Sequence, residues 1–123
     1  IQIEVHRPKF SKITNMSKNE TSKEIQDRVN TARRIQMERY KKYNISSNSQ
    51  LSTKLVKQYC GLDTKGKILL ESAFKKLNLS MRGYEKILKV ARTIADLEQK
   101  ENIEYKHIAE AIQYRSLDKK YDN

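Results

Sequence analysis

The sequence is poor in the residues that build tight turns and disulfide frameworks. Its 123 residues include no Trp, one Pro, three Gly and one Cys. The small number of Gly and Pro residues argues against an all-β fold with many tight turns. The single cysteine, Cys60, excludes an internal disulfide and fits a reducing cytoplasm. No apolar run approaches the roughly 20 residues that span a membrane, and no signal peptide is visible. We therefore expect a helical, cytoplasmic protein without a membrane partner.

Positive charge is what the sequence has in excess, with a net charge of +11. Residues 1–43 carry eleven Lys or Arg against five Asp or Glu (+6), and residues 44–79 carry six against two (+4). Residues 80–123 are nearly balanced, with nine against eight (+1). This gradient favours nucleic acid or another polyanion as a partner, and a solvated cationic surface explains it equally well.

Residues 1–20 predict a strand followed by a linker. Residues 1–5 alternate apolar and polar, which is the period of a half-buried strand, and Pro8 ends it. Residues 9–20 are polar without a clear period. Because no second strand candidate follows, this segment is either the last strand of a sheet in a longer parent protein or a frayed tail. The chain begins without Met, so we favour the strand of a longer parent.

A long basic helix is predicted from residue 21 to about residue 43, opened by the capping-box pair Thr21 and Glu24. It carries five cations that we consider as nucleic-acid contacts: Arg33, Arg34, Arg39, Lys41 and Lys42. Tyr40 and Tyr43 are available to stack on bases. The alternative is that these tyrosines complete the apolar seam of the helix, while the cations are solvated or favour its C-terminus.

The remaining chain, residues 44–123, predicts a small helical bundle. Besides a central helix, three helices are expected, at about residues 52–59, 64–78 and 105–115. We expect Gly61 to end the first of these in the left-handed conformation, and Asp63 to cap the second, which buries Ile68. His107 on the last helix is expected to be partly exposed. The predicted fold is thus all-α, a bundle of three or four helices preceded by a long basic helix and one stray strand.

The central helix of this bundle has the strongest pattern, over residues 79–97. Apolar residues, Met81 among them, cover nearly half of the cylinder, and Asp96 falls on the opposite polar face. Ser80 is a good N-cap. A stripe this wide predicts a helix that is packed by several neighbours.

The first turn of the central helix predicts an anion site. Arg82 lies there, where a cation opposes the helix dipole at a cost of roughly 0.3–1 kcal/mol. Together with Lys86 and free backbone N–H groups it would attract a phosphate, and Gly83 would let a ligand approach the backbone. The alternative is that Arg82 pairs with Glu85 on the same helix.

No complete catalytic or metal site is visible in the sequence. It has no Gly-rich phosphate loop, no G-K-[ST] motif and no Ser/His/Asp set. His6 has no second ligand at metal-binding spacing, and Cys60 has no nearby base. We therefore expect neither a bound metal nor turnover of a substrate by this chain alone.

Motifs along nearly the whole chain resemble the C-terminal part of the magnesium-chelatase-like AAA+ ATPases of the ComM/YifB group. The central match is L-S-M-R-G-Y-E-K-I-L-K-V-A-R-T-I-A-D-L, followed by I-A-E-A-I-Q-Y-R-S-L-D. The last strand of the ATPase core resembles I-Q-I-E-V-H-R-P, and the connecting helix is similar to I-Q-D-R-V-N-T-A-R-R-I-Q-M-E-R-Y. The start of the lid matches N-S-Q-L and C-G-L-D.

This resemblance implies a role for each part of the chain. Residues 1–20 would end the AAA+ core and lead into a linker, residues 21–43 would be the connecting helix, and residues 44–123 would be the lid that closes over ATP. Arg82 would correspond to the sensor-2 arginine, which contacts the γ-phosphate. Arg92 lies in the same block and is expected to be structural.

The resemblance also implies a parent protein. It would be a cytoplasmic ATPase in a ring, expected to be hexameric, with ATP and Mg as cofactors that this fragment does not bind alone. The phosphate-binding loop, the Mg-coordinating acids and the arginine finger would lie upstream. The ComM branch is linked to DNA branch migration in competence, so a DNA-processing motor is the expected function. A basic DNA-binding or protein-interaction module and a magnesium-chelatase ATPase subunit are the alternatives.

Overall fold

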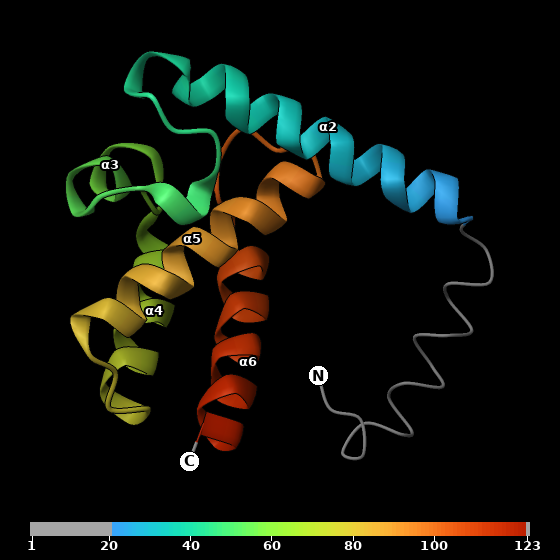
Figure 1. Cartoon of the computed structure of the whole chain (residues 1–123). Coiled ribbons are helices and arrows are strands. Elements are labelled where there is room, and N and C mark those ends of the chain that lie inside the picture. Colours follow the sequence, from blue (N-terminus) through green and yellow to red (C-terminus); the bar gives the residue numbers. More distant parts are fainter. Residues whose placement is uncertain (1–20, 123) are drawn as a thin grey trace.

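The computed structural model describes residues 21–122, with side chains described up to residue 115, and contains no strand in that range. Its elements are α2 (Ser22–Tyr40), η2 (Lys41–Tyr43), η3 (Asn48–Gln50), α3 (Thr53–Tyr59), α4 (Thr64–Lys76), α5 (Met81–Leu97) and α6 (Tyr105–Asp122) (Figure 1). The predicted all-α bundle behind a long helix is confirmed. The predicted strand and linker lie outside the described residues. None of the described helices combines the length and apolar character needed to cross a bilayer.

α5 lies at the centre of the bundle. It contacts α2, α3, η3 and α6, and α6 also packs against α4. Its buried apolar residues are Ile87, Leu88, Ala91, Ile94 and Ala95. A helix surrounded by several neighbours needs such a wide stripe, so the prediction for this helix is confirmed.

The buried residues of α2 all lie in its C-terminal half. It crosses the end of α5, while its first turns extend beyond the other helices (Figure 1). Residues 21–28 are exposed, and the buried residues of α2 are Ala32, Gln36 and Tyr40, at four-residue steps. The attachment is therefore a narrow stripe that includes a polar amide.

Three tyrosines gather where α2, η2 and α3 meet. The ring of Tyr59 lies edge-on to Tyr40, with 5.2 Å between centroids, and edge-on to Tyr43, at 5.9 Å. The Tyr59 hydroxyl donates to the Tyr43 oxygen over 3.1 Å. The alternative in which Tyr40 and Tyr43 complete the apolar seam of the helix therefore agrees with the structure.

The predicted helix starts are confirmed by their capping bonds. The N–H of Glu24 donates to Thr21 Oγ1 at 3.0 Å, and the Thr21 N–H donates back to Glu24 Oε1 at 2.7 Å. Asp63 and Ser80 each accept the N–H of the third helical residue, at 2.8 and 3.0 Å. These bonds satisfy backbone donors that have no partner within the helix.

The prediction of a left-handed Gly61 is wrong. Positive φ angles occur instead at Asn44 (60°), Asn78 (53°) and Gln99 (57°), which follow η2, α4 and α5. The backbone ends α3 at Cys60 with φ −118°, so Gly61 is not needed for the turn. Asn visits the left-handed region more readily than most residues, because its short polar side chain bonds locally.

Three further sequence expectations are corrected. Ile68 was expected to be buried but is 63% exposed. The buried residues of α4 are Gly66, Leu70 and Ala73, and Ile68 does not lie in that row. Met81 is the first residue of α5 and is 62% exposed. The last helix continues to Asp122 and does not end near residue 115.

Gly66 and Gly83 occupy equivalent places in the first turns of α4 and α5, and both are buried. A Cβ atom on Gly83 would lie 3.5 Å from Arg115 Nη2, which is an ordinary contact, whereas one on Gly66 would lie 3.2 Å from Asp63 Oδ1. The expectation that Gly83 admits a ligand to the backbone is therefore wrong, because its N–H is used by Ser80 and Arg115 covers it.

This pair of glycines gives a matched test of the packing. We expect Gly83→Ala to raise the free energy of unfolding by about 0.5–1 kcal/mol, because Ala is the better helix residue and the space exists. Gly66→Ala should gain less or lose stability, because the capping carboxylate of Asp63 would have to shift. Urea unfolding followed by circular dichroism measures both, and a Gly83→Ala variant less stable than Gly66→Ala would contradict the structure.

Candidate functional site

An open groove of about 870 Å3 lies along one face of α5. α2 contributes Arg28 to its walls, η3 contributes Ser49, and α6 contributes Glu110 and Tyr114. Arg82 and Lys86, the two residues predicted to face a nucleotide, both line this groove. The structure therefore brings them to one surface.

Arg82 is exposed at the start of α5 and has no hydrogen-bond or ion-pair partner among residues 21–115. The alternative partner, Glu85, instead accepts a hydrogen bond from Thr53 Oγ1 on α3, at 3.3 Å. The positive charge of Arg82 is thus left uncompensated next to the positive end of the α5 dipole.

Side chains of both charges line the groove, and cations outnumber acids in the first half of α5. Arg82, Lys86 and Lys89 follow one another there at three- and four-residue steps, with Glu85 between them, and Glu98 lies beyond the end of the helix. Apolar side chains line the groove between them: Val90, Ile94 and Leu97. Arg115 of α6 is not part of the groove lining but lies over Gly83 in the first turn of α5, and its buried Nε has no partner among the described residues. The cation-rich first half of α5 can therefore attract an anion.

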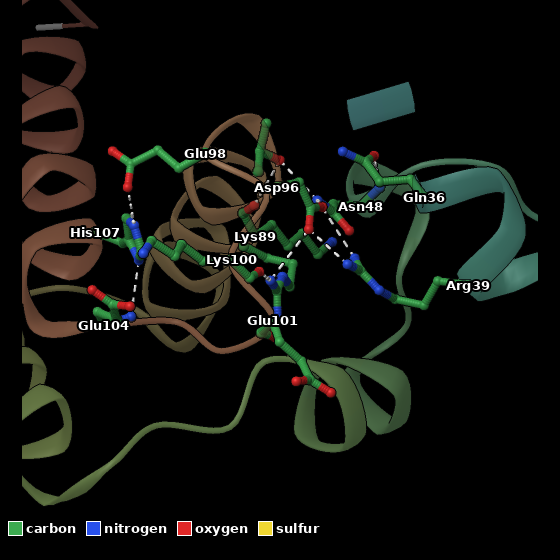
Figure 2. A network of polar contacts seen from close by, with 12 residues as sticks. Gln36, Arg39, Asn48, Lys89, Asp96, Glu98, Lys100, Glu101, Glu104 and His107 are labelled. Atoms are coloured by element: carbon green, nitrogen blue, oxygen red, sulfur yellow. Dashed lines mark hydrogen bonds and ion pairs between the residues drawn. The ribbon is translucent and has the colours of Figure 1, made fainter. Parts of the chain in front are cut away.

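A buried polar network centred on Asp96 occupies the other end of α5 (Figure 2). The Asp96 carboxylate has no exposed area and accepts both arms of the Arg39 guanidinium, Nη2 at 2.6 Å and Nη1 at 3.0 Å. Arg92 Nη2 lies 3.2 Å from Oδ1, and Asn48 Nδ2 donates to Oδ2 at 3.0 Å. The prediction that Asp96 lies on the polar outer face is wrong. Asp96 is buried, and these partners offset the cost of burying its charge.

Arg92 holds this network on the bundle side. It is buried, pairs with Asp96, and donates to the carbonyl oxygens of Lys100 (2.8 Å) and Glu101 (3.0 Å). It thereby ties the loop between α5 and α6 to the end of α5. The structural role expected for Arg92 is confirmed.

Asn48 joins three elements in the same network. Its N–H donates to Gln36 Oε1 on α2 at 3.0 Å, and its side-chain amide donates to Thr93 Oγ1 on α5 at 3.0 Å. Its Oδ1 accepts the Tyr40 hydroxyl in a short hydrogen bond. Burial alone would lower the pKa of Arg39, but hydrogen bonds to Asp96 and Tyr40 raise it above its ordinary value.

His107 is completely buried at the start of α6, so the prediction of a partly exposed histidine is wrong. Its Nδ1 accepts the N–H of Glu104 at 2.9 Å, which places the proton of the neutral ring on Nε2. Nε2 lies 3.0 Å from Glu98 Oε1, and Lys106 Nζ lies 3.2 Å from the same oxygen. The pKa of Glu98 is lowered, first by the His107 hydrogen bond and then by Lys106.

The predicted nucleic-acid contacts on α2 separate into two kinds. Arg33 and Arg34 are exposed, and Arg34 also donates to Thr31 Oγ1 at 3.2 Å. Arg39 is only 17% exposed, and Asp96 binds its guanidinium. Arg39 therefore belongs to the buried network rather than to an open cationic surface.

The cations that follow α2 also have partners. Lys41 Nζ lies 2.7 Å from Glu38 Oε2, and Lys42 Nζ lies 5.4 Å from the centroid of the Tyr43 ring. Both lysines remain exposed. Tyr40 is fully buried, so its ring has no free face for a base.

A family model described as magnesium chelatase, subunit ChlI C-terminal, matches residues 19–115. The chain belongs to this family. The match spans α2 to most of α6 and includes every residue of the groove and of the Asp96 network. The resemblance noted in the sequence is confirmed.

Curated relatives agree with this family. The chain is 44% identical over 98 residues to the competence protein ComM of Haemophilus influenzae, covering 80% of the chain and 18% of that relative. It is 37% identical over 100 residues to the uncharacterized protein YifB of Escherichia coli, covering 81% and 19%. For YifB of Salmonella typhimurium the values are 38% over 103 residues, covering 84% and 20%. The chain spans about a fifth of the length of these relatives, and no solved structure matches it.

Sequence reasoning missed Asn48, the burial of Asp96 and the position of Arg115. One signal was present: Leu88, Arg92 and Asp96 follow each other at four-residue steps, so they form one row that begins with a buried residue. Nothing local shows that Arg39, 57 positions before Asp96, completes the pair.

Asp96→Asn tests the network through stability. We expect the variant to lose about 3–5 kcal/mol of unfolding free energy, because Arg39 and Arg92 keep their buried charges without a counter-charge. Urea unfolding measures this. The control is Asp27→Asn, which removes an exposed pair with Lys23 and should change stability by about 0.5 kcal/mol or less. Equal effects of the two variants would contradict the importance of the network.

Proposed function

We propose that this chain is the C-terminal lid of an AAA+ ATPase of the ComM/YifB type, and that Arg82 contacts the terminal phosphate of ATP in the full-length protein. The proposal depends on the exposed Arg82 guanidinium, which lines the groove and has no partner among residues 21–115. A cation in a first turn costs about 0.3–1 kcal/mol unless an anion is near. A phosphate held between the lid and an ATPase core would supply that anion.

Lys86 supports the same site. It lies one turn after Arg82 and lines the same groove. In the proposed full-length protein, the phosphate-binding loop and the residues that hold Mg belong to the upstream core, so this chain contributes cations. Cations placed in advance stabilise the charge that develops on a transferred phosphoryl group.

The proposal extends to the whole protein. We propose a cytoplasmic ring, expected to be hexameric, in which the core of the same chain precedes α2. DNA is the substrate that we favour, because one relative is named a competence protein. The positive charge of the chain is compatible with a polyanionic substrate.

Replacing Arg82 tests the nucleotide role. In the full-length protein, Arg82→Ala should lower kcat for ATP hydrolysis by about tenfold or more, because a charge that stabilises the transition state is lost. The control is Lys65→Ala, which removes an exposed cation from the equivalent position in the first turn of α4.

Circular dichroism should show that both variants remain folded, because both side chains are exposed. Turnover by Arg82→Ala equal to that of Lys65→Ala would reject the assignment of Arg82.

A second candidate function is polyanion binding by α2. It is favoured by Arg33 and Arg34, which lie exposed on a helix that extends beyond the bundle (Figure 1). Such a surface binds phosphates by releasing counterions, without a base-specific contact.

Fluorescence polarisation with single- and double-stranded DNA over a salt series tests this second function. The double variant Arg33→Ala/Arg34→Ala should bind more weakly. The slope of the logarithm of the binding constant against the logarithm of the salt concentration should become shallower by about 1–2. The matched control replaces two exposed cations at the end of α4, Lys75→Ala/Lys76→Ala. Absence of binding by the unmodified chain at low salt would remove this candidate.

A further inference from the structure

We infer that the ion pair between Arg39 and Asp96 is the joint that fixes the direction of α2 relative to α5, and thereby positions Arg82. The direction of α2 follows from contacts within the described residues. The positioning of Arg82 rests on the proposed function, in which the ATPase core precedes α2 and the lid acts on its nucleotide.

Apolar burial alone does not fix the direction of α2. Tyr40 is its only residue in the buried hydrophobic cluster among the residues described, while Met37 is 56% and Ile25 39% exposed. The other buried apolar residue of α2, Ala32, offers only a methyl group, so apolar contacts constrain the direction of this helix weakly. Another interaction must therefore set its angle.

Directional hydrogen bonds supply that angle. Both arms of the Arg39 fork bind Asp96, at 2.6 and 3.0 Å, and a planar fork on a carboxylate is satisfied over a narrow range of orientations. Gln36, one turn earlier on α2, accepts the N–H of Asn48 at 3.0 Å. Two successive turns of α2 are thus held by geometry-sensitive contacts (Figure 2).

The α5 side of the joint is itself fixed. Arg92 binds Asp96 and two loop carbonyl groups, so the carboxylate cannot turn to follow a displaced Arg39. Because Asp96 has no exposed area in this arrangement, its charge is stabilised by protein partners and not by water. Any other direction of α2 leaves a buried charge with too few hydrogen bonds, which is costly.

α5 connects this joint to Arg82. Asp96 lies in the last turns of the helix and Arg82 in the first, 14 residues apart, which is about 21 Å along the axis. The intervening helix is packed on several sides. A change in the direction of α2 therefore displaces Arg82 unless the joint yields, which makes Arg39 and Asp96 positioning residues.

Distances between spin labels test the joint directly. One pair, Gln26→Cys with Lys75→Cys, reports α2 against α4, and a second pair, Lys54→Cys with Lys75→Cys, reports the bundle alone. All three positions are exposed. Native Cys60 stays unlabelled, because it is 3% exposed and burial raises the pKa of its thiol to about 11.

In Arg39→Gln we expect the α2 to α4 distance distribution to widen at least twofold, while the bundle pair stays unchanged. Arg39→Lys keeps a charge beside Asp96 and should preserve the fold, but it should also widen the distribution because ammonium has no fork. The matched control is Arg34→Gln, an exposed arginine on the same helix, which should stay narrow. Narrow distributions in both Arg39 variants would overturn the inference.

ATP hydrolysis by the full-length protein tests whether the Arg39–Asp96 pair positions Arg82. Arg39→Gln should lower kcat at least fivefold while KM for ATP changes less than twofold, because the core would still bind the nucleotide. Unchanged kcat with a widened distance distribution would overturn positioning of Arg82 by the joint. If Arg82→Ala itself leaves turnover unchanged, the proposed function fails, and the distance measurements still decide the joint.

Discussion

One buried carboxylate holds the long helix and the bundle together. Asp96 gathers two guanidinium groups and an amide around it, and each comes from a different element or turn of the chain. A charge in that position is stable only when its partners arrive together. The burial of Asp96 therefore makes the attachment of α2, the seating of η3 and the closure of the loop after α5 interdependent.

The two ends of α5 use arginine in opposite ways. Arg92 is buried, with its charge opposed by Asp96 and its N–H groups bonded to loop carbonyls. Arg82 is exposed and has no acidic partner among residues 21–115. At one end of α5 the charge of Arg92 is compensated, and its contacts hold the helix in place. At the other end the charge of Arg82 is not compensated, so binding of an anion there is favourable. The family match covers both arginines.

Local chemistry explains which features could be predicted from the sequence. The caps at Thr21, Asp63 and Ser80 depend on neighbours three residues away, and the stripe of α5 depends on helical period, so both were predictable. The Arg39 to Asp96 pair joins residues 57 positions apart, which periodicity does not encode. His107 and Gly83 were misjudged for the same reason, because their surroundings come from other parts of the chain.

The tyrosine cluster gives this chain a built-in optical reporter. This chain has no Trp, so the near-ultraviolet emission of the chain by itself comes from its seven Tyr residues. Three of them, Tyr40, Tyr43 and Tyr59, stack edge to face where the long helix meets the bundle. Their emission and near-ultraviolet dichroism will respond to loosening at that junction in the unmodified protein. Changes in the position of the helix can thus be followed in solution without attaching a dye.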